Sequence, residues 1–272
     1  MYLLFKNDVD VYFKILGSSS SGNSAILKVS DSTILIDAGM TGRKLETLLK
    51  NIGMNPENLD AVFLTHEHND HSAGVRGLSK FQNLPIFANR DTIQALQPKL
   101  RKRPNWKIFE TGNSFSFGPF KIDPFSVPHD AYDPVGFYFE WGKDDLFEPR
   151  SSLAWVTDLG FVPTLVKEKI RKANILVIEA NHCSKMLEED TKRPWSLKQR
   201  IRGRHGHLSN DNTYEILNSI EKPCWEKLFL MHLSKDCNDI QNIRERFSGF
   251  KKNGKKFTTY IIDPSTAETI PL

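Results

Sequence analysis

The sequence predicts an α/β protein, because short apolar runs that end in Gly, Asp or His alternate with segments of helical period. Residues 32–37 form such a run, which is typical of a buried strand. After a short turn, leucine and isoleucine side chains recur at the spacing i, i+3, i+4, i+7 from Leu45 to Ile52, so one face of a helix is apolar. Thr41 lies where the N-cap of this helix is expected. Strand, turn and helix therefore follow in the order of an α/β unit.

The same alternation continues along the chain. Further strands are predicted at residues 61–64, 85–88, 135–141, 153–157, 175–179, 227–231 and 257–262. Further helices are predicted near residues 91–100, 162–172, 211–221 and 237–248. The sequence contains no repeat at a period typical of solenoids or propellers. We therefore expect residues 1–272 to form a single domain.

Length and composition exclude several classes of protein. The chain has 272 residues, of which 39% are hydrophobic and 26% are charged, so it can bury a sizeable core and is not expected to be disordered. Its 16 glycines and 14 prolines are too few for a collagen-like or low-complexity protein. No stretch is apolar for long enough to form a signal-peptide core or a membrane span, so no membrane partner is expected.

Cysteine usage indicates the compartment. The chain carries three cysteines, Cys183, Cys224 and Cys237, without C-x-x-C spacing. An odd number without that spacing favours reduced thiols over a disulfide framework. The sequence therefore predicts a cytoplasmic protein.

Basic residues gather in two stretches, although the formal net charge is only +4. Residues 99–107 hold five basic side chains and residues 192–204 hold six, and neither stretch contains an acidic residue. Both are also consistent with ordinary solvated loops, and this alternative stays open. The second stretch lies in the least regular part of the chain, about 184–206, where we expect a basic loop or lid between two strands.

The most informative residues directly follow the predicted strand 61–64. The sequence Thr65-His66-Glu67-His68-Asn69-Asp70-His71 places four metal-competent side chains within six positions. Side chains two apart on an extended segment share a face, so His66 and His68 can bind one ion, while Asp70 and His71 can reach a second ion after the chain turns. Donors packed this densely compete or repel unless a cation holds them. The cluster therefore predicts two neighbouring metal ions.

Two pairs of side chains cannot fill two metal coordination spheres, so further ligands are expected at later strand ends. His129, Asp158 and His232 each close an apolar run. The two oxygens of a carboxylate suit Asp158 to bridging both ions, and His129 and His232 would then complete one sphere each. An isolated aspartate at such a place would more simply begin a turn, and its position between the two histidines favours the ligand role.

Together these motifs resemble those of the metallo-β-lactamase-superfamily hydrolases. Five motifs match in order over most of the chain: Asp37, the cluster from His66 to His71, His129, Asp158 and His232. The resemblance implies a four-layered αββα sandwich with its metals at the sheet edge. It also implies the ligand assignment: His66, His68 and His129 for the first metal, Asp70, His71 and His232 for the second, and Asp158 as the bridge. Asp37 is implied to orient the metal-binding loop without binding a metal itself.

Two divalent ions per chain, zinc or manganese, are the expected cofactors, because the ligand set mixes nitrogen and oxygen donors. Class B β-lactamases often place a cysteine in the second metal shell, whereas this chain has Asp158 at the fourth motif. Flavodiiron oxygen reductases usually have glutamate at the position of His68. These departures favour a dinuclear hydrolase over either of those branches.

Three further stretches resemble motifs of the nuclease branches of the superfamily. They are the strand end 178–182 with Glu179, the segment 206–210 with His207, and the segment 231–238 with His232. The sequence Ser20-Ser21-Gly22-Asn23-Ser24 resembles the opening motif of the compact bacterial YycJ-type proteins. Asp158 and Glu179 are only 21 positions apart, which leaves no room for the cap domain of β-CASP nucleases. The transfer-RNA-binding arm of the 3′-processing nucleases has no clear counterpart either.

The favoured function is a metal-dependent phosphodiesterase that acts on nucleic acid, and the resemblance to the YycJ-type family implies a DNA exonuclease. A hydroxide bridging two metals would attack phosphorus, and His207, held by Glu179, would protonate the leaving oxygen. Asp70 and Asp37 complete the residues that we assign to catalysis. Substrate contacts are expected from the basic lid and the helix entry after it: Arg200, Arg202, Arg204, Ser209 and Asn210.

Two other functions stay open. An acyl hydrolase of the same fold, such as a lactonase or thioesterase, would use the same metals with a different leaving group. A non-catalytic nucleic-acid-binding or regulatory protein would be expected to lack metal ligands, and none is missing from this sequence. The glycine- and serine-rich segment 17–22 also has two interpretations, a phosphate cradle of backbone N–H groups or a plain turn between the first two strands. No protein partner can be inferred.

Overall fold

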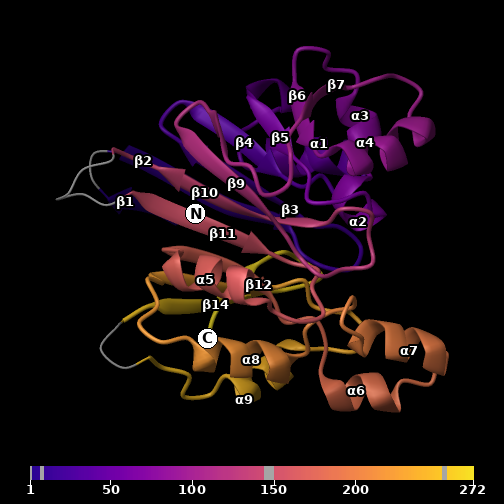
Figure 1. Ribbon diagram of the computed structural model, residues 1–272, viewed down its shortest axis with the longest axis vertical. Coiled ribbons are helices and arrows are strands. Elements are labelled where there is room, and N and C mark those ends of the chain that lie inside the picture. The colour runs from indigo at the N-terminus through magenta and orange to yellow at the C-terminus, as the bar shows by residue number, and fades with distance from the viewer. Residues whose placement is uncertain (1, 7–8, 144–149, 253–255) are drawn as a thin grey trace. The chain divides into compact units, whose positions relative to one another are not determined.

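The computed structural model describes residues 2–6, 9–143, 150–252 and 256–272 (Figure 1). The chain forms two compact units, and each unit draws on more than one stretch of sequence. The first comprises Met1–Pro124, Ala131–Val135 and Glu140–Arg150, and the second comprises Phe125–Asp130, Gly136–Phe139 and Ser151–Leu272. The single domain expected for residues 1–272 stays a prediction.

The first unit contains a seven-stranded sheet whose strands follow their order in the chain. Neighbouring strands are antiparallel from β1 to β4 and parallel from β4 to β7. Their bounds are β1 Tyr2–Lys6, β2 Val9–Gly17, β3 Ser24–Val29, β4 Ser32–Ile36, β5 Ala61–Phe63, β6 Pro85–Ala88 and β7 Asn105–Ile108. The parallel strands end at the same edge of the sheet, and the predicted metal-binding motif begins directly after β5 at that edge.

Short helices connect the parallel strands of this sheet: α1 Gly42–Lys50, η1 Pro56–Asn58, α2 Asn69–Ser72, α3 Val75–Leu78, α4 Arg90–Leu96 and η2 Gln97–Lys99. Thr41 caps α1 as predicted, because its hydroxyl accepts a hydrogen bond from the backbone N–H of Lys44 at 3.4 Å. Leu45 and Leu49 of α1 are buried in one core with strand residues such as Val62. A helix this short depends on the burial of its apolar face, since its intrinsic stability in water is marginal.

The end of α1 is fixed by a Schellman motif. The N–H of Gly53 donates to the carbonyl of Lys50 at 3.0 Å, and the N–H of Met54 donates to the carbonyl of Leu49 at 2.9 Å. Gly53 has a φ of +74°, a conformation that glycine adopts without strain. The motif directs the chain from the helix back across the sheet.

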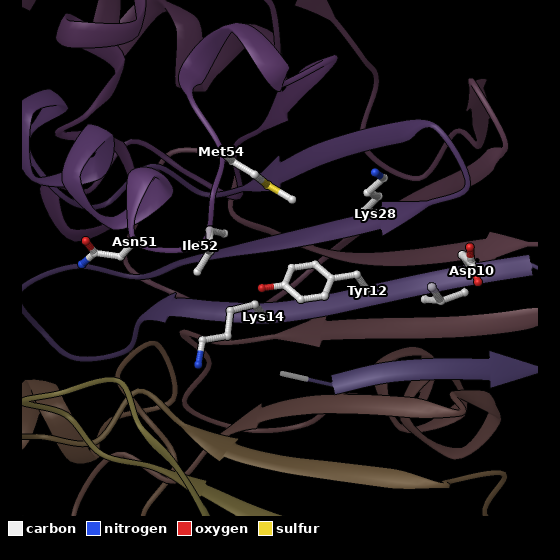
Figure 2. Close-up of a pocket in the computed structure, with 8 residues that line it drawn as sticks. Asp10, Tyr12, Lys14, Lys28, Asn51, Ile52 and Met54 are labelled. Carbon is white, nitrogen blue, oxygen red and sulfur yellow. The ribbon is translucent and has the colours of Figure 1, made fainter.

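A pocket of about 610 Å³ lies between this turn and the first strands of the sheet (Figure 2). Tyr12, Lys14 and Lys28 of the sheet line one part of it, and Ile52 and Met54 after α1 line another. Tyr12 and Lys28 are directly opposite in the register of β2 and β3, so both side chains project from the same face. None of the residues that line this pocket is a predicted metal ligand.

A second sheet has eight strands in the order β15-β14-β13-β12-β11-β10-β9-β8. Its strands β11 to β15 lie wholly in the second unit, where β11 to β14 are parallel and β15 is antiparallel to β14. The bounds are β8 Phe115–Phe117, β9 Phe120–Ser126, β10 Val135–Trp141, β11 Ser151–Val156, β12 Ile175–Glu179, β13 Lys227–Met231, β14 Thr258–Ile262 and β15 Thr269–Pro271. Every residue of β12 is buried, which explains why this strand is a continuous apolar run up to its final glutamate.

The helices of the second unit are α5 Thr164–Lys172, α6 Ser184–Glu189, α7 Trp195–Arg202, α8 Asn210–Ser219 and α9 Ile240–Arg246. Val166 and Ile170 of α5 and Leu217 of α8 are buried in one apolar core with Trp225. The indole N–H of Trp225 donates to the carbonyl of Ile170 at 2.6 Å, which satisfies its polar atom inside that core. In the part of the chain that the structure describes, no helix is long and apolar enough to cross a membrane.

Most of the predicted elements are present, and four predicted strands have the predicted bounds: 85–88, 135–141, 175–179 and 227–231. The segment 184–206 differs from the expected loop, because it contains α6 and α7. Only Leu187 of α6 and Lys198 of α7 are buried, so neither helix has the apolar stripe that reveals a helix in sequence. Pro194 precedes the first turn of α7, a place where its missing N–H costs no helical hydrogen bond.

Candidate active site

The predicted metal-binding motif of the first unit lies where β4 and β5 end. Asp37 directly follows β4, and its backbone N–H donates to the carbonyl of Phe63, the last residue of β5, at 2.8 Å. Asp37 has a φ of +57°, in the left-handed region that costs a residue with a side chain about 1–3 kcal/mol. Backbone strain of this kind is concentrated at functional sites, where the surrounding structure maintains it.

The buried carboxylate of Asp37 orients the motif. Its Oδ2 accepts a hydrogen bond from Nδ1 of His71 at 2.8 Å, and its Oδ1 accepts one from the backbone N–H of Thr65 at 2.8 Å. The Thr65 hydroxyl lies 3.0 Å from Nδ1 of His66. Because the carboxylate holds the proton on Nδ1 of His71, the Nε2 atom of that ring keeps the lone pair that can bind a metal.

Four donor side chains of the motif lie together within the first unit. The His66 ring centre is 4.6 Å from that of His68 and 4.3 Å from that of His71. Asp70 lies in the first turn of α2, with its Oδ2 3.6 Å from Nε2 of His71. His66 and His71 are buried, while His68 and Asp70 are half-buried. The dense set of donors that the sequence predicted is therefore present at the end of β5.

The serine-rich segment before β3 supports this motif from the side. The N–H of Gly22 donates to the carbonyl of Ser19 at 3.0 Å. This N–H group therefore closes a plain turn and does not form part of a phosphate cradle. The N–H of Asn23 donates to the carbonyl of Asp70 at 2.7 Å, and Nδ2 of Asn23 lies 3.1 Å from Nε2 of His71. The opening motif of the sequence thus has a structural counterpart as a brace for Asp70 and His71.

Gly39 is required by the close approach of this brace. A Cβ atom at position 39 would lie 1.7 Å from the carbonyl oxygen of Asp70. The N–H of Gly39 also donates to the carbonyl of Asn23 at 2.9 Å. Any side chain there would push the metal-binding motif away from the segment that supports it.

In the second unit, Asp158 and His232 follow β11 and β13, the two strands that flank β12. Both have left-handed backbones, with φ of +59° and +60°. Oδ1 of Asp158 lies 3.7 Å from Nε2 of His232 and 3.6 Å from Nε2 of His129. Ligand atoms bound tetrahedrally at zinc–ligand distances are about 3.4 Å apart, so these three atoms have the spacing of ligands around cations.

Glu179, the last residue of β12, is the central acceptor of this unit. Its Oε1 accepts hydrogen bonds from the backbone N–H groups of Leu159 at 3.0 Å and Leu208 at 2.9 Å. Its Oε2 accepts hydrogen bonds from Nδ1 of His207 at 3.1 Å and Nδ1 of His232 at 3.0 Å. Burial alone would raise the pKa of Glu179, but the charges and hydrogen bonds of the two histidines lower it to about 2. Glu179 is therefore an ionised acceptor shared by both rings.

The pKa values of His207 and His129 are shifted in opposite directions. Burial alone would lower the pKa of His207, but the charge and hydrogen bond of Glu179, with the charge of Asp158, raise it above its ordinary value. The His207 side chain remains 22% exposed, and Glu179 occupies its Nδ1. Burial lowers the pKa of His129, whose Nδ1 lies 3.2 Å from the carbonyl oxygen of Gly206. His207 is thus suited to donate a proton, and neutral His129 is suited to bind a metal.

These donors fit divalent metals. In the second unit, one atom from each of Asp158, Glu179, His207 and His232 lies within 4.8 Å of the others. An oxygen atom also lies at Nδ1 of His71, His129 and His232, so Nε2 of each ring is the atom suited to bind a metal. At His71 the amide of Asn23, 3.1 Å from Nε2, would have to move aside. Within each unit the predicted ligands therefore lie together, while their assignment to two particular ions stays a prediction.

The predicted substrate contacts of α7 and the residues after it are engaged within the second unit. Arg200 and Arg202 form ion pairs with acidic side chains of that unit. The Arg204 guanidinium lies 4.3 Å from the ring centre of Phe161. These interactions hold α7 in place, so a phosphate would have to compete for Arg200 and Arg202.

The side chains of Ser209 and Asn210 form hydrogen bonds at the start of α8. The Ser209 hydroxyl accepts a hydrogen bond from the N–H of Asn212 at 3.1 Å and so caps the helix. The amide of Asn210 donates to Oδ1 of Asn238 at 2.9 Å. Both side chains are buried. Their hydrogen bonds favour a structural role over the substrate contact that the sequence suggested.

Tyr132, whose side chain is 76% exposed, is not among the site residues predicted from the sequence. Its backbone N–H donates to Oε1 of Glu67, inside the metal-binding motif, at 3.2 Å. The next residue, Asp133, is held by Asn89 at 2.6 Å and by Thr111 at 2.7 Å. The loop is therefore fixed against the motif and presents an aromatic ring to solvent. The only sequence signal is an aromatic residue in a turn.

Comparison with known proteins gives three informative matches. The β-lactamase superfamily domain matches residues 32–233. Exodeoxyribonuclease WalJ of Streptococcus pneumoniae is 37% identical over 236 residues, which cover 85% of each chain. Exodeoxyribonuclease YycJ of Bacillus anthracis is 32% identical over 230 residues, which cover 84% of each chain.

A solved structure shares the fold. The metallo-β-lactamase fold protein YhfI from Bacillus subtilis matches with a TM-score of 0.69 and 18% identity, over 98% of this chain and 100% of its own. The α/β class and the metallo-β-lactamase fold predicted from the sequence are confirmed. The chain belongs to the β-lactamase superfamily.

Proposed function

We propose that this chain is a metal-dependent phosphodiesterase that degrades DNA from an end. The observation that carries the proposal is the Glu179 carboxylate, which holds both the predicted metal ligand His232 and the protonatable His207. The alkoxide that leaves a phosphodiester is a strong base, so its departure is helped by such a proton donor beside the metals. The two exodeoxyribonuclease relatives, aligned over most of the chain, support the same substrate class.

Two divalent ions, zinc or manganese, are the proposed cofactors. We assign His66, His68 and His129 to the first ion, Asp70, His71 and His232 to the second, and Asp158 to both. Imidazole and carboxylate donors suit either metal. When bound, such ions lower the pKa of water and neutralise negative charge on the phosphate. Asp37 contributes by holding His71 in the orientation that binds a metal through Nε2.

His207 is the proposed general acid. Its Nδ1 proton is held by Glu179, so its Nε2 proton is the one that can be transferred. The raised pKa of His207 favours the protonated ring near neutral pH. As the phosphorus–oxygen bond breaks, the Nε2 proton passes to the leaving oxygen, and the neutral ring regains a proton from solvent before the next cycle.

Tyr132 supplies a surface suited to nucleic acid. Its exposed ring is fixed beside the metal-binding motif through the hydrogen bond to Glu67. Nucleobases stack on aromatic side chains without sequence preference, and each stack contributes about 1–3 kcal/mol. Arg200, Arg202 and Arg204 would add phosphate contacts only by exchanging the partners that they have in this structure.

The alternative functions differ in their use of these residues. A thiolate departs without protonation, so a thioesterase would not need the pairing of His207 with Glu179. A lactone releases an alkoxide and could use the same pairing, so turnover of lactones is the observation that distinguishes a lactonase. A non-catalytic nucleic-acid-binding protein would not need the full ligand set. The three cysteines are free thiols, which supports a cytoplasmic location.

The first experiment measures the reaction itself. Metal-replete protein is incubated with end-labelled single- and double-stranded DNA and RNA, with zinc, manganese or a chelator. We expect DNA to shorten progressively from one end, with activity abolished by the chelator. Turnover of lactones or thioesters without cleavage of nucleic acid would identify an acyl hydrolase, and no turnover of any of these substrates would favour the non-catalytic alternative.

Substitution of Asp158 tests the dinuclear site. We expect two ions per wild-type chain and a loss of affinity at both positions in Asp158→Ala, because only a bridging ligand contacts both ions. Elemental analysis and metal titration measure this loss. Asp158→Asn is the matched control, since asparagine tolerates the left-handed backbone while it removes the charge. If either variant keeps one ion at full affinity, Asp158 is not the bridge.

Substitution of His207 tests the general acid. His207→Ala should retain both metals and lower kcat on DNA by roughly 10²–10⁴-fold, the usual scale for loss of general acid–base catalysis. On a p-nitrophenyl phosphodiester the loss should be small, because that leaving group departs without a proton. Equal losses on both substrates, with metals retained, would assign His207 a positioning role.

The pH profile supplies a second measurement for His207. Activity on DNA requires the protonated ring, so kcat should fall as pH rises through the raised pKa of His207. Glu179→Gln removes the carboxylate that raises this pKa, so the fall should move to lower pH. Because Glu179 also holds His232, metal content is measured in the same variant. A profile that does not move in metal-replete Glu179→Gln would contradict the assignment.

Substitution of Tyr132 tests the stacking surface. Tyr132→Ala should raise KM for an oligonucleotide roughly 5–100-fold, which corresponds to the loss of one stacked base. Tyr132→Phe should keep the wild-type KM, since it retains the ring, and neither change should alter turnover of a small p-nitrophenyl phosphodiester. An unchanged KM in Tyr132→Ala would remove this residue from substrate binding.

A further inference from the structure

The two basic stretches of the chain differ in what their side chains contact. In residues 192–204, Arg193 pairs with Asp190 at 2.6 Å and with Asp236 at 2.8 Å, and Lys198 donates to a backbone carbonyl at 2.7 Å. Arg200 and Arg202 are paired as well. Most of these cations are therefore already engaged in ion pairs or hydrogen bonds within the second unit.

The cations of residues 99–107 lie in a different environment. All five are exposed: Lys99, Arg101, Lys102, Arg103 and Lys107. Within the described part of the chain, no ion pair or side-chain hydrogen bond engages any of them. The sequence favoured residues 192–204 for phosphate contact. Within the described residues, however, it is the cations of residues 99–107 that have no ion-pair partner.

The segment that carries these cations is anchored to the first unit. We call residues 99–103, which run from the last residue of η2 toward β7, the β7 basic loop. Leu100 and Trp106, on either side of the charged residues, pack against the core of the first unit. The indole N–H of Trp106 donates to Oε1 of Gln97 at 2.8 Å, and the N–H of Leu100 donates to the carbonyl of Gln97 at 3.1 Å. These contacts fix the position of the segment that carries the cations.

Protection of a sheet edge does not account for this charge. β7 is the last strand of its sheet, and lysine on an edge strand discourages pairing with other chains. Lys107 lies in β7 and is explained in this way. The other four cations precede the strand and cannot block its edge, so they call for a different explanation.

We propose that the β7 basic loop is an accessory binding site for the phosphate backbone of a nucleic-acid strand. The inference rests on the proposed nuclease function and extends it to a second contact on the substrate. Exposed Lys and Arg side chains without carboxylate partners bind phosphates through charge and counterion release, and this binding is independent of sequence. The tripeptide Arg101-Lys102-Arg103 has no apolar side chain that could enter a lipid layer, which favours nucleic acid over a membrane surface.

The register of the sheet fixes where this site lies relative to the metal-binding motif. Asn105 of β7 is level with Pro85 of β6, and the next residue of β6 is level with Val62 of β5. The β7 basic loop precedes this level and the motif follows it, so they lie at opposite ends of the parallel strands. Two residue steps from Arg103 to Asn105 and four from the level of Ala61 to Thr65 separate them along the strand direction, or roughly 20 Å for an extended backbone. A single strand can extend to roughly twice the 3.4 Å rise that it has in a duplex, so it needs at least about three nucleotides to reach from one to the other.

The test compares long and short substrates. In the variant with Arg101→Gln, Lys102→Gln and Arg103→Gln, KM for a single strand of about 30 nucleotides should rise roughly tenfold at 0.15 M salt. The slope of log KM against log salt should decrease by about 0.7 for each phosphate that the loop no longer neutralises. KM for a dinucleotide, which is too short to reach the loop, should not change, and kcat should not change on either substrate.

A matched variant controls for net charge. Arg43, Lys44 and Lys50 are exposed cations on α1 of the same unit, and their replacement by glutamine removes the same charge elsewhere. This control should leave KM for the long strand near the wild-type value. An equal rise in both variants, or a rise on the dinucleotide, would overturn the accessory site.

Direct binding separates this inference from the proposed function. Fluorescence anisotropy with a labelled strand of about 30 nucleotides should show weaker binding for the loop variant than for the control variant. If the wild type cleaves DNA but the loop variant binds and cleaves like the control, only the accessory site is wrong. If the wild type does not cleave but the loop variant still binds more weakly, the proposed nuclease function is wrong and the site stands. Loss of binding to phosphatidylserine vesicles with unchanged binding to DNA would instead identify a membrane contact.

Discussion

The site residues of the second unit depend on one buried charge, the carboxylate of Glu179. An ionised carboxylate out of contact with water is destabilising by several kcal/mol unless its oxygens are hydrogen-bonded. Four donors satisfy it, and they come from three separate segments: the turn after Asp158, the entry to α8, and the end of β13. Ionisation of Glu179 therefore fixes the position of a predicted bridging ligand, a predicted metal ligand and the proposed proton donor at once. Loss of the charge would release all three together.

Asp37 is the corresponding buried, hydrogen-bonded carboxylate of the first unit. It is buried at the end of a parallel strand, and it accepts hydrogen bonds from the backbone N–H of Thr65 and from Nδ1 of His71. Asp37, Asp158 and His232 all have left-handed backbones directly after or near a strand end. In each case the chain turns sharply enough to leave a polar side chain at the sheet edge, and the hydrogen bonds to buried partners offset the strain. The two units thus use the same local device to place side chains that either bind a metal or orient a metal ligand.

Much of this arrangement could be predicted because it follows from local sequence. The strands 175–179 and 227–231 are buried parallel strands, which require continuous apolar runs, and polar residues that interrupt such runs mark their ends. The sharing of Glu179 between His207 and His232 could not be predicted, since these partners are 28 and 53 positions away. His232 meets Glu179 through the register of β12 and β13, and His207 meets it through the segment that leads into α8. The brace from Asn23 to His71 spans 48 positions for the same reason. The helices α6 and α7 were missed because almost none of their surface is buried.

The two basic stretches show that sequence alone does not predict which cations are paired with carboxylates. Both lack acidic residues, so their local compositions give no reason to distinguish them. The difference comes from carboxylates outside each stretch. Asp190 and Glu188, which lie just before the segment 192–204, and the distant Asp130 and Asp236 pair with this segment, whereas no carboxylate of the described chain reaches the β7 basic loop. A paired cation must give up its carboxylate before it can bind a phosphate and so contributes little, whereas an unpaired one can neutralise a phosphate and release a counterion from the nucleic acid. Affinity for a nucleic-acid strand should therefore follow the number of unpaired cations along its path and not the number of basic residues in a segment.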